Sequence, residues 1–277
     1  MDYQERIKRA AEAVENANYL IIGGGSGLSD AAGLHFIGKR FTDNFGPFID
    51  KYGMEDMYTS SFYPFKTEEE RWAYWAKHIS LNRYDTPATQ LYLDLFKLAK
   101  RKTYFVITTN VDHQFYKAGF PVEKIFAVQG DYGFFQCAKG CHTKLYYNED
   151  IVKDMLAQTV ECKIPMKLVP HCPVCGGLMD VNLRKDNYFV EDEAWYAASN
   201  RYTAFVRETT DKQVVYLELG VGFNTPGIIR LPFEQMIYQN PNAILIRINS
   251  HQPHGAKENS SKTISFSEDM TKVLAAL

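Results

Sequence analysis

A run of glycines near the N-terminus has the composition of a loop that holds a nucleotide phosphate. Four apolar residues, Tyr19 to Ile22, lead into Gly23, Gly24, Gly25, Ser26 and Gly27. This order predicts a buried strand that ends in a loop whose uncovered amide N–H groups can point at an anion. A helix that begins near Ser29 or Asp30 would add its positive end to the same site. The third glycine of the usual G-x-G-x-x-G motif is missing, so a tight turn without a ligand is the alternative.

Four of the five cysteines have the spacing of a structural zinc site. Cys137-x3-Cys141 and Cys172-x2-Cys175 are separated by 30 residues, and two such pairs can place four thiolates tetrahedrally around one Zn²⁺. Four thiolates saturate the metal, so the site would hold a small module together without an open position for catalysis. Because the first pair departs from the usual x2 spacing, Cys162, His142 and His171 are possible substitutes among the ligands. The alternatives to a structural zinc site are unrelated thiols and a nucleic-acid-binding zinc ribbon, although this segment is not rich in Lys and Arg.

Polar residues follow the apolar runs that we expect to form further strands. Thr108 to Asp112 close the run that starts at residue 103, and Gln129 with Gly130 closes the run 124–130. Gly220 to Gly222 and Asn249 follow two later runs. Because the carboxyl ends of parallel strands border a common crevice, these residues are candidates for contacts with one ligand. Capping of turns by Thr, Asn and Asp is the alternative for each of them.

Helical and strand patterns alternate along the chain, which predicts an α/β fold with a doubly wound, Rossmann-like parallel sheet. We expect one domain from residues 1–130 and 190–277, with an aromatic-rich helical cap segment over 35–85. Residues 131–189 carry all five cysteines and no long helical period. They are therefore expected to form a small inserted zinc-ribbon module.

Composition narrows the classes of partner. The chain has 277 residues and a net charge of −2, so no excess of positive charge indicates nucleic acid or an anionic membrane as partner. No apolar run approaches the length of a membrane span. The first 17 residues form an amphipathic pattern and do not resemble a signal peptide. Cysteines without a secretion signal favour a reducing compartment, so we expect a cytoplasmic protein.

The motifs and their order resemble those of the sirtuins. Residues 25–34 match the loop G-A-G-I-S-x-x-A-G-I, residues 108–112 match T-Q-N-I-D, and the cysteines match the zinc-ribbon module of that family. The resemblance implies that NAD⁺ lies between the Rossmann-like domain and the zinc module. It also implies that C1′ of the nicotinamide ribose is attacked as nicotinamide leaves. The implied NAD-binding residues are Gly25, Ser26, Gly27, Leu28, Ser29, Asp30, Gly33, Leu34, Thr109, Asn110, Val111, Asp112, Gln129, Gly220, Val221, Gly222 and Asn249.

Three segments depart from the sirtuin pattern. Residues 35–38 stand where the family has P-D-F-R, so the acidic and basic NAD contacts expected there are absent. Gln129 replaces the histidine that serves sirtuins as general base, and glutamine cannot take a proton near neutral pH. Val190, Glu191 and Asp192 replace the F-G-E end of the stretch that receives the acyl-lysine peptide. A different acceptor is therefore expected.

These departures resemble the macrodomain-linked, class M sirtuins of bacteria and fungi. The resemblance implies transfer of ADP-ribose from NAD⁺ to a lipoylated, glycine-cleavage-H-like carrier protein in response to redox stress, with a macrodomain ADP-ribosyl hydrolase as a further partner. Asn110 and Asp112 would orient the nicotinamide ribose and amide, and Gln129 would steady that ribose. His35 and His113 are candidates for a weak base, although a structural role explains each of them more simply. NAD-dependent lysine deacylation and a non-catalytic NAD sensor remain alternatives.

Overall fold

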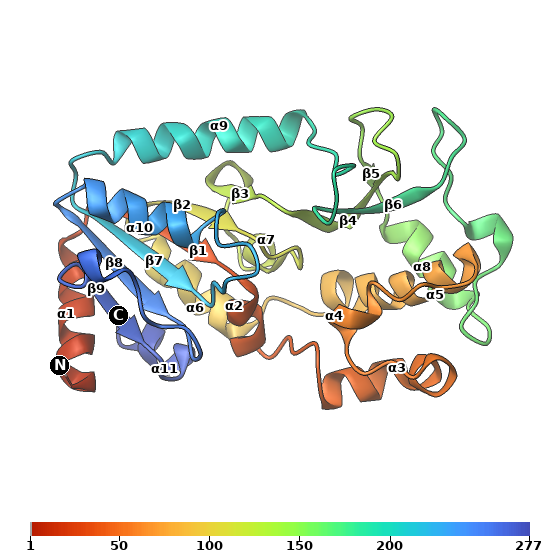
Figure 1. The fold of residues 1–277 in the computed structure, drawn as a ribbon, viewed down its shortest axis with the longest axis horizontal. Helices are drawn as coiled ribbons and strands as arrows, with labels where there is room; N and C mark the ends of the chain where they lie inside the picture. The colour runs from red at the N-terminus through yellow and green to blue at the C-terminus, as the bar shows by residue number, and fades with distance from the viewer. Residues whose placement is uncertain (1) are drawn as a thin grey trace.

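A six-stranded parallel sheet forms the larger lobe of the computed structural model, which describes residues 2–277 (Figure 1). The strand order is β3-β2-β1-β7-β8-β9. The chain moves outward in one direction from β1 to β3 and in the other from β7 to β9, so the direction changes beside β1. The predicted doubly wound sheet is confirmed. The strands are β1 (Tyr19–Gly24), β2 (Thr103–Thr108), β3 (Ile125–Ala127), β7 (Val214–Leu219), β8 (Ala243–Ile248) and β9 (Thr263–Phe266).

Both faces of this sheet are buried under helices, which is why its strands are continuous apolar runs. Successive side chains of a strand point to opposite faces, so Leu20 and Ile22 enter one core whereas Ile21 enters the other. The first core is covered by α1 (Tyr3–Asn16), α6 (Gln90–Ala99) and α11 (Met270–Ala275), and the second by α9 (Glu193–Glu208) and α10 (Arg230–Gln239). Two short helices, α2 (Ser26–Ala31) and α7 (Gln114–Lys117), follow β1 and β2 directly.

The start of α2 differs from the prediction. The helix begins at Ser26 and not near Ser29 or Asp30, because Gly25 takes the extended conformation of an N-cap residue with φ −119° and ψ −178°. The glycine loop is therefore shorter than expected. The carboxyl end of β1 passes into helix almost without a connection.

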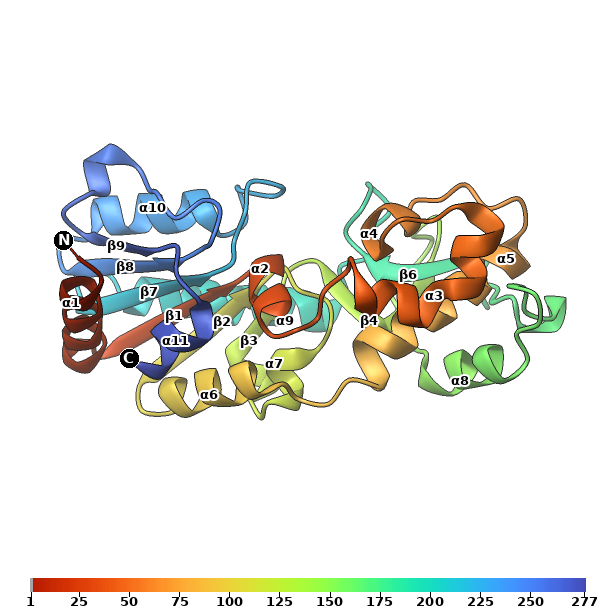
Figure 2. The ribbon, with the colours of Figure 1, turned by 90° about the horizontal axis from the view of Figure 1, so that it is seen from below.

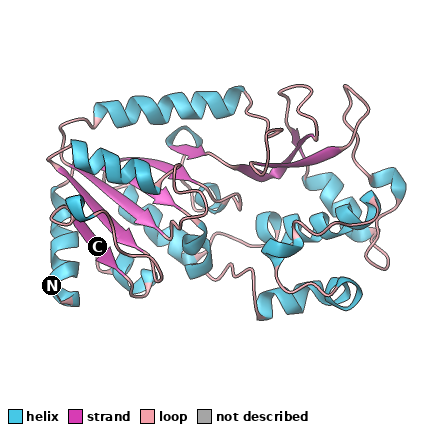
Figure 3. Ribbon diagram, in the orientation of Figure 1, coloured by secondary structure: helices cyan, strands magenta, loops and turns pink. Residues whose placement is uncertain are grey.

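The smaller lobe combines two segments that lie far apart in the sequence. Its antiparallel sheet has the order β5-β4-β6 and is separate from the larger one (Figure 3). Helices from residues 39–84 and α8 pack with this sheet around one core, at one end of the molecule (Figure 2). The elements are α3 (Lys39–Tyr52), α4 (Met57–Ser60), α5 (Glu68–Ile79), the π-helix η1 (Ser80–Tyr84), β4 (Gly130–Cys137), β5 (Tyr146–Tyr147), α8 (Glu149–Ala157) and β6 (Met179–Leu183). Short 3-10 turns are η2 (Val122–Lys124), η3 (Met166–Leu168) and η4 (Lys257–Asn259).

A histidine is fully buried in the core of this smaller lobe. His78 contacts the hydroxyl groups of Tyr74 and Tyr132 through its two ring nitrogens, at 3.2 Å and 3.0 Å. Tyr74 donates its own proton to the carbonyl of Met57, so Nδ1 of His78 must donate and Nε2 must accept. Burial and the nearby charge of Arg40 lower the pKa of His78 to about 3. The ring is therefore neutral.

Within residues 2–277 we find no helix with the length and apolar character that crossing a bilayer requires.

Candidate active site

Glycines allow the start of α2 and the loop after β7 to touch through their backbones. A Cβ atom on Gly27 would lie 2.7 Å from Cα of Gly220, and one on Gly25 would lie 2.7 Å from the Gly220 carbonyl oxygen. Gly220 has a φ of +61°, and its own Cβ would lie 2.3 Å from the backbone nitrogen of Leu28. These glycines are thus required for packing at the point where the sheet changes direction. The expected uncovered amide groups are not found at Gly25 and Gly27, whose N–H groups donate to the carbonyl groups of Leu219 at 3.0 Å and Gly220 at 2.9 Å.

The residues predicted to orient the nicotinamide ribose form one polar network. Asn110 follows β2, and its Nδ2 donates to the Gly25 carbonyl at 3.0 Å and to Oη of Tyr92 at 3.1 Å. Ser29 contacts the same Tyr92 hydroxyl at 3.0 Å and donates to Oδ2 of Asp112 at 2.5 Å. Ser29 of α2 and Asn110 and Asp112 of the loop after β2 are therefore joined in one network with Tyr92, which sequence reasoning missed.

Burial dominates the electrostatics of this network. It raises the pKa of Asp112, although hydrogen bonds from Ser29 and from the backbone of Gln114 oppose that effect. Burial also raises the pKa of Tyr92 well above its usual value, so Tyr92 remains a neutral hydroxyl. Tyr92 is inaccessible to solvent, so it can act on a ligand only by holding Asn110 and Ser29 at fixed positions.

Gln129 lies where the chain leaves the larger sheet for the smaller one. Its Nε2 donates to Oγ1 of Thr225 at 3.3 Å, which links the end of β3 to the loop after β7. The next residue, Gly130, has a φ of +94°, and a Cβ there would lie 2.1 Å from the carbonyl oxygen of Asn182. The amide of Gln129 can donate or accept a hydrogen bond, but it cannot remove a proton near neutral pH.

Both histidines proposed as weak bases are paired with carboxylates. His35 is exposed and lies 2.7 Å from Oδ1 of Asp30. Nδ1 of His113 lies 2.5 Å from Oδ2 of Asp131, and Oδ1 of the same carboxylate accepts from Nε of Arg83 at 2.7 Å. Burial would raise the pKa of Asp131, but the hydrogen bond from His113 and the charges of His113 and Arg83 outweigh it and lower that pKa. His113 and Arg83 therefore share one ionised carboxylate that joins the two lobes.

Sequence analysis did not identify Arg40, a cation whose charge interacts with that of Asp112. Arg40 in α3 is half-buried and donates to Oδ1 of Asn82 at 2.9 Å and to the Leu81 carbonyl at 3.2 Å. Among residues 2–277 no carboxylate lies within ion-pairing distance of its guanidinium group. Burial lowers the pKa of Arg40, and the charge of Asp112 acts in the opposite direction. In the sequence, Arg40 comes two residues after the segment 35–38, in which the basic residue of the sirtuin pattern is absent.

The remaining candidates lie in the same loops. Nδ2 of Asn249 donates to the Val221 carbonyl at 3.0 Å, and the backbone of Gly220 donates to the Ile248 carbonyl at 2.9 Å. Leu28 and Leu34 are buried, so their side chains face the protein interior. The other predicted contacts on this edge are Ser26, Asp30, Gly33, Thr109, Val111 and Gly222.

The four cysteines predicted to bind zinc converge at one end of the smaller sheet. Their sulfur atoms all lie within 4.8 Å of one another, with 3.7 Å between Cys137 and Cys175 and 3.6 Å between Cys141 and Cys172. Tetrahedral coordination with Zn–S bonds of about 2.3 Å separates sulfurs by about 3.8 Å. The cluster therefore fits zinc. The metal would tie the end of β4 to the 172–175 turn, and Cys162 lies outside the cluster.

No protein-family model matches the chain, but two curated proteins are similar to it over most of its length. A protein ADP-ribosyltransferase of Staphylococcus aureus (strain Mu50 / ATCC 700699) is 36% identical over 274 residues, covering 98% of this chain and 87% of that protein. A "probable bifunctional ADP-ribose hydrolase/ADP-ribosyltransferase" of Fusarium oxysporum f. sp. cubense is 32% identical over 261 residues, covering 88% of this chain and 42% of that protein.

Solved structures of sirtuins have the same fold. A Sir2 protein bound to a propionylated peptide aligns with a TM-score of 0.61 and 17% identity, covering 97% of this chain and 95% of that one. A complex of a Sir2 homologue with NAD aligns with a TM-score of 0.60 and 15% identity, covering 96% and 90%. The predicted resemblance to sirtuins is thus confirmed at the level of the fold. Given its 36% identity to the staphylococcal enzyme over nearly the whole chain, this protein belongs to the protein ADP-ribosyltransferases that are built on the sirtuin fold.

Proposed function

We propose that this protein transfers ADP-ribose from NAD⁺ to a lipoylated carrier protein and releases nicotinamide, as class M sirtuins do. The observation that carries the proposal is Gln129. A sirtuin deacylase needs a base at this position to activate a ribose hydroxyl, and an amide cannot serve as one. Direct transfer does not need that step, because the acceptor itself attacks the ribose.

The proposed mechanism assigns a role to each part of the site. The amide group of Ser26, at the start of α2, binds the pyrophosphate, with Arg40 as a nearby cation. Asn110 and Asp112 hold the nicotinamide ribose, and Gln129 donates a hydrogen bond to one of its hydroxyl groups. A nucleophilic atom of the acceptor bonds to C1′ as the bond from C1′ to the nicotinamide nitrogen breaks. Polar groups around C1′ stabilise its positive charge in the transition state.

The name of the fungal relative combines a hydrolase of ADP-ribose with a transferase. This combination supports a macrodomain ADP-ribosyl hydrolase as the partner that reverses the modification. The five cysteines are free of disulfides in the structure, which supports a cytoplasmic location.

The test is nicotinamide release from NAD⁺ with lipoylated and unlipoylated forms of the same carrier, followed by the intact mass of each carrier. We expect a gain of one ADP-ribose unit on the lipoylated form alone, and no gain with the Asn110→Ala variant. Equal gain on both forms would contradict the role of the lipoyl group. Release without any gain, or loss of an acyl group from a lysine peptide, would replace transfer with hydrolysis or deacylation.

A further inference from the structure

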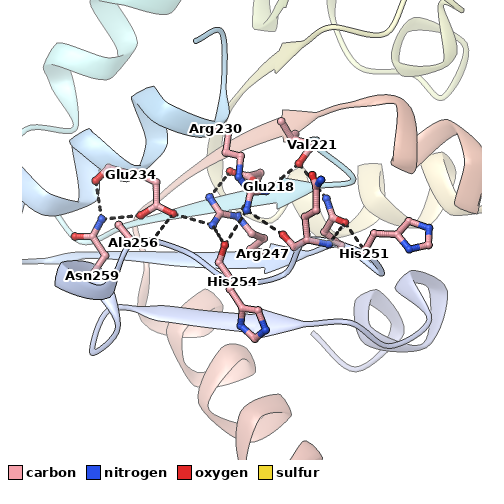
Figure 4. A network of polar contacts seen from close by, with 11 residues as sticks. Glu218, Val221, Arg230, Glu234, Arg247, His251, His254, Ala256 and Asn259 are labelled. Carbon is pink, nitrogen blue, oxygen red and sulfur yellow. Dashed lines mark hydrogen bonds and ion pairs between the residues drawn. The ribbon is translucent and has the colours of Figure 1, made fainter. Parts of the chain in front are cut away.

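Three buried charged side chains and a fourth that is 12% exposed, that of Glu234, lie together beneath the loops that follow β7 and β8 (Figure 4). Glu218 on β7 and Arg247 on β8 are inaccessible to solvent, and Arg230 and Glu234 both belong to α10. Arg247 donates to the two oxygens of Glu218 at 2.6 Å and 3.0 Å and to Oε1 of Glu234 at 2.7 Å. Nη1 of Arg230 lies 3.6 Å from Oε1 of Glu218. We call these four residues the buried ionic network.

The guanidinium groups of this network also hold the backbone of both loops. Arg230 donates to the carbonyl groups of Val221 at 3.0 Å, Gln252 at 3.0 Å and His254 at 2.7 Å. Arg247 donates to the same His254 carbonyl at 3.1 Å. One side chain of α10 thus fixes three carbonyl groups from two loops. A guanidinium can do so because its donors form a rigid planar fork, which an ammonium group lacks.

Stability alone does not explain such a network. Buried ion pairs can be replaced by well-packed apolar side chains with little loss or even a gain in stability, because desolvation of the charges is costly. What an apolar replacement cannot supply is a set of directional hydrogen bonds to loop carbonyls. The arrangement therefore favours a role in fixing the position of the loops.

Both loops lie on the edge of the sheet that carries the candidate active site. Gly220, at the start of the first loop, touches Gly27, and Thr225 in the same loop accepts a hydrogen bond from Gln129. Phe223, which lies between Gly220 and Thr225 in the sequence, is half exposed, and its ring centroid lies 4.3 Å from the guanidinium carbon of Arg230. A shift of Arg230 would be transmitted to each of these contacts.

We propose that Arg230, supported by the rest of the buried ionic network, is a positioning residue for the adenosine half of NAD⁺. The inference rests on the proposed function in one respect, that NAD⁺ is the ligand. With the nicotinamide ribose at Asn110 and Gln129, beyond β2 and β3, and the pyrophosphate at the end of β1, the other half of the dinucleotide extends over β7 and β8. Those are the strands whose loops Arg230 holds.

The test compares binding of ADP-ribose, measured by calorimetry, with kcat and KM for nicotinamide release from NAD⁺. We expect Arg230→Met to weaken ADP-ribose binding and to raise KM by roughly tenfold to a hundredfold. At saturating NAD⁺, kcat should stay within about threefold, because Arg230 does not face the reacting carbon. Arg230→Lys keeps the charge but loses the fork, so it should show the same direction of change.

Arg6→Met is the matched control. Arg6 also pairs with a carboxylate, Glu268, and donates to a backbone carbonyl, that of Ser265, but it belongs to α1 and joins that helix to β9 and the residues after it. This variant should lose stability without a change in ADP-ribose binding. The proposal is overturned if a folded Arg230 variant binds ADP-ribose as the wild type does, if kcat falls while KM is unchanged, or if the wild type fails to bind ADP-ribose. Binding of ADP-ribose that depends on Arg230, without transfer to any carrier, would instead refute only the proposed function.

Discussion

Substitution of Gly220 tests whether backbone contact between the loop after β7 and the start of α2 sets the geometry of the active site. In Gly220→Ala, the new Cβ would lie 2.3 Å from the backbone nitrogen of Leu28, whereas ordinary contact begins at 3.4 Å. The loop and the helix must therefore separate by about 1 Å, and a displacement of that size can cost about a hundredfold in rate. We expect kcat/KM for nicotinamide release to fall by that factor, which corresponds to about 2.7 kcal/mol of transition-state stabilisation.

The backbone strain of the substitution can be measured separately. Gly53 ends α3 with a φ of +66° and has nothing within 4 Å of its Cβ position, whereas Gly220 has a nearly equal φ of +61° and close neighbours. Gly53→Ala should cost about 1 kcal/mol of folding stability, from the left-handed conformation alone, and leave kcat/KM unchanged. If Gly220→Ala lost no more stability than Gly53→Ala in thermal melts and retained its kcat/KM, the inferred role of the loop contact would be refuted.

Three further predictions concern the site and the smaller lobe. Asn110→Ala should reduce kcat for nicotinamide release by about 10²–10³; full activity would remove Asn110 from the site. Cys172→Ser should lower the zinc content and the melting temperature while the remaining folded protein keeps its kcat, because the metal supplies stability and not chemistry; unchanged stability would argue against a structural metal. His78 binds a proton in the unfolded chain near pH 6.5 but in the folded protein only near pH 3, so stability falls as the pH drops below 6.5, by about 2 kcal/mol at pH 5. In His78→Gln, unfolding by urea should show no such loss between pH 7 and pH 5, and an unaltered slope would contradict the buried neutral ring.

The strands of the larger sheet were predictable because each is a short apolar run that ends in glycine or polar residues. The nine-residue helix α8 was missed, since its segment was interpreted from its cysteines and turns. Tyr92 could not be assigned to the site, because in the sequence it is one more aromatic residue on the buried face of a helix. Only the folded chain brings it to Asn110.

Charged residues within two apolar runs of the sequence indicate the buried ionic network. Glu218 interrupts the apolar run 214–220, and Arg247 interrupts the run 243–249. A charged residue within a strand that is covered on both faces needs a buried partner of opposite charge. The two neighbouring strands supply these partners to each other. Their helical partners, Arg230 and Glu234, could not be identified in this way, because charged residues are ordinary on the surface of a helix.

The shared core of the smaller lobe has a consequence for the order of folding during synthesis. Trp72 and Phe45 emerge from the ribosome long before β4 and β6, against which their helices pack. Those helices cannot complete their core until the second segment has been made, and contacts between distant segments form slowly. Aromatic side chains of the first segment thus stay available to other chains and to chaperones throughout that interval. Zinc, bound by the later segment, can stabilise this lobe only at the end of its assembly.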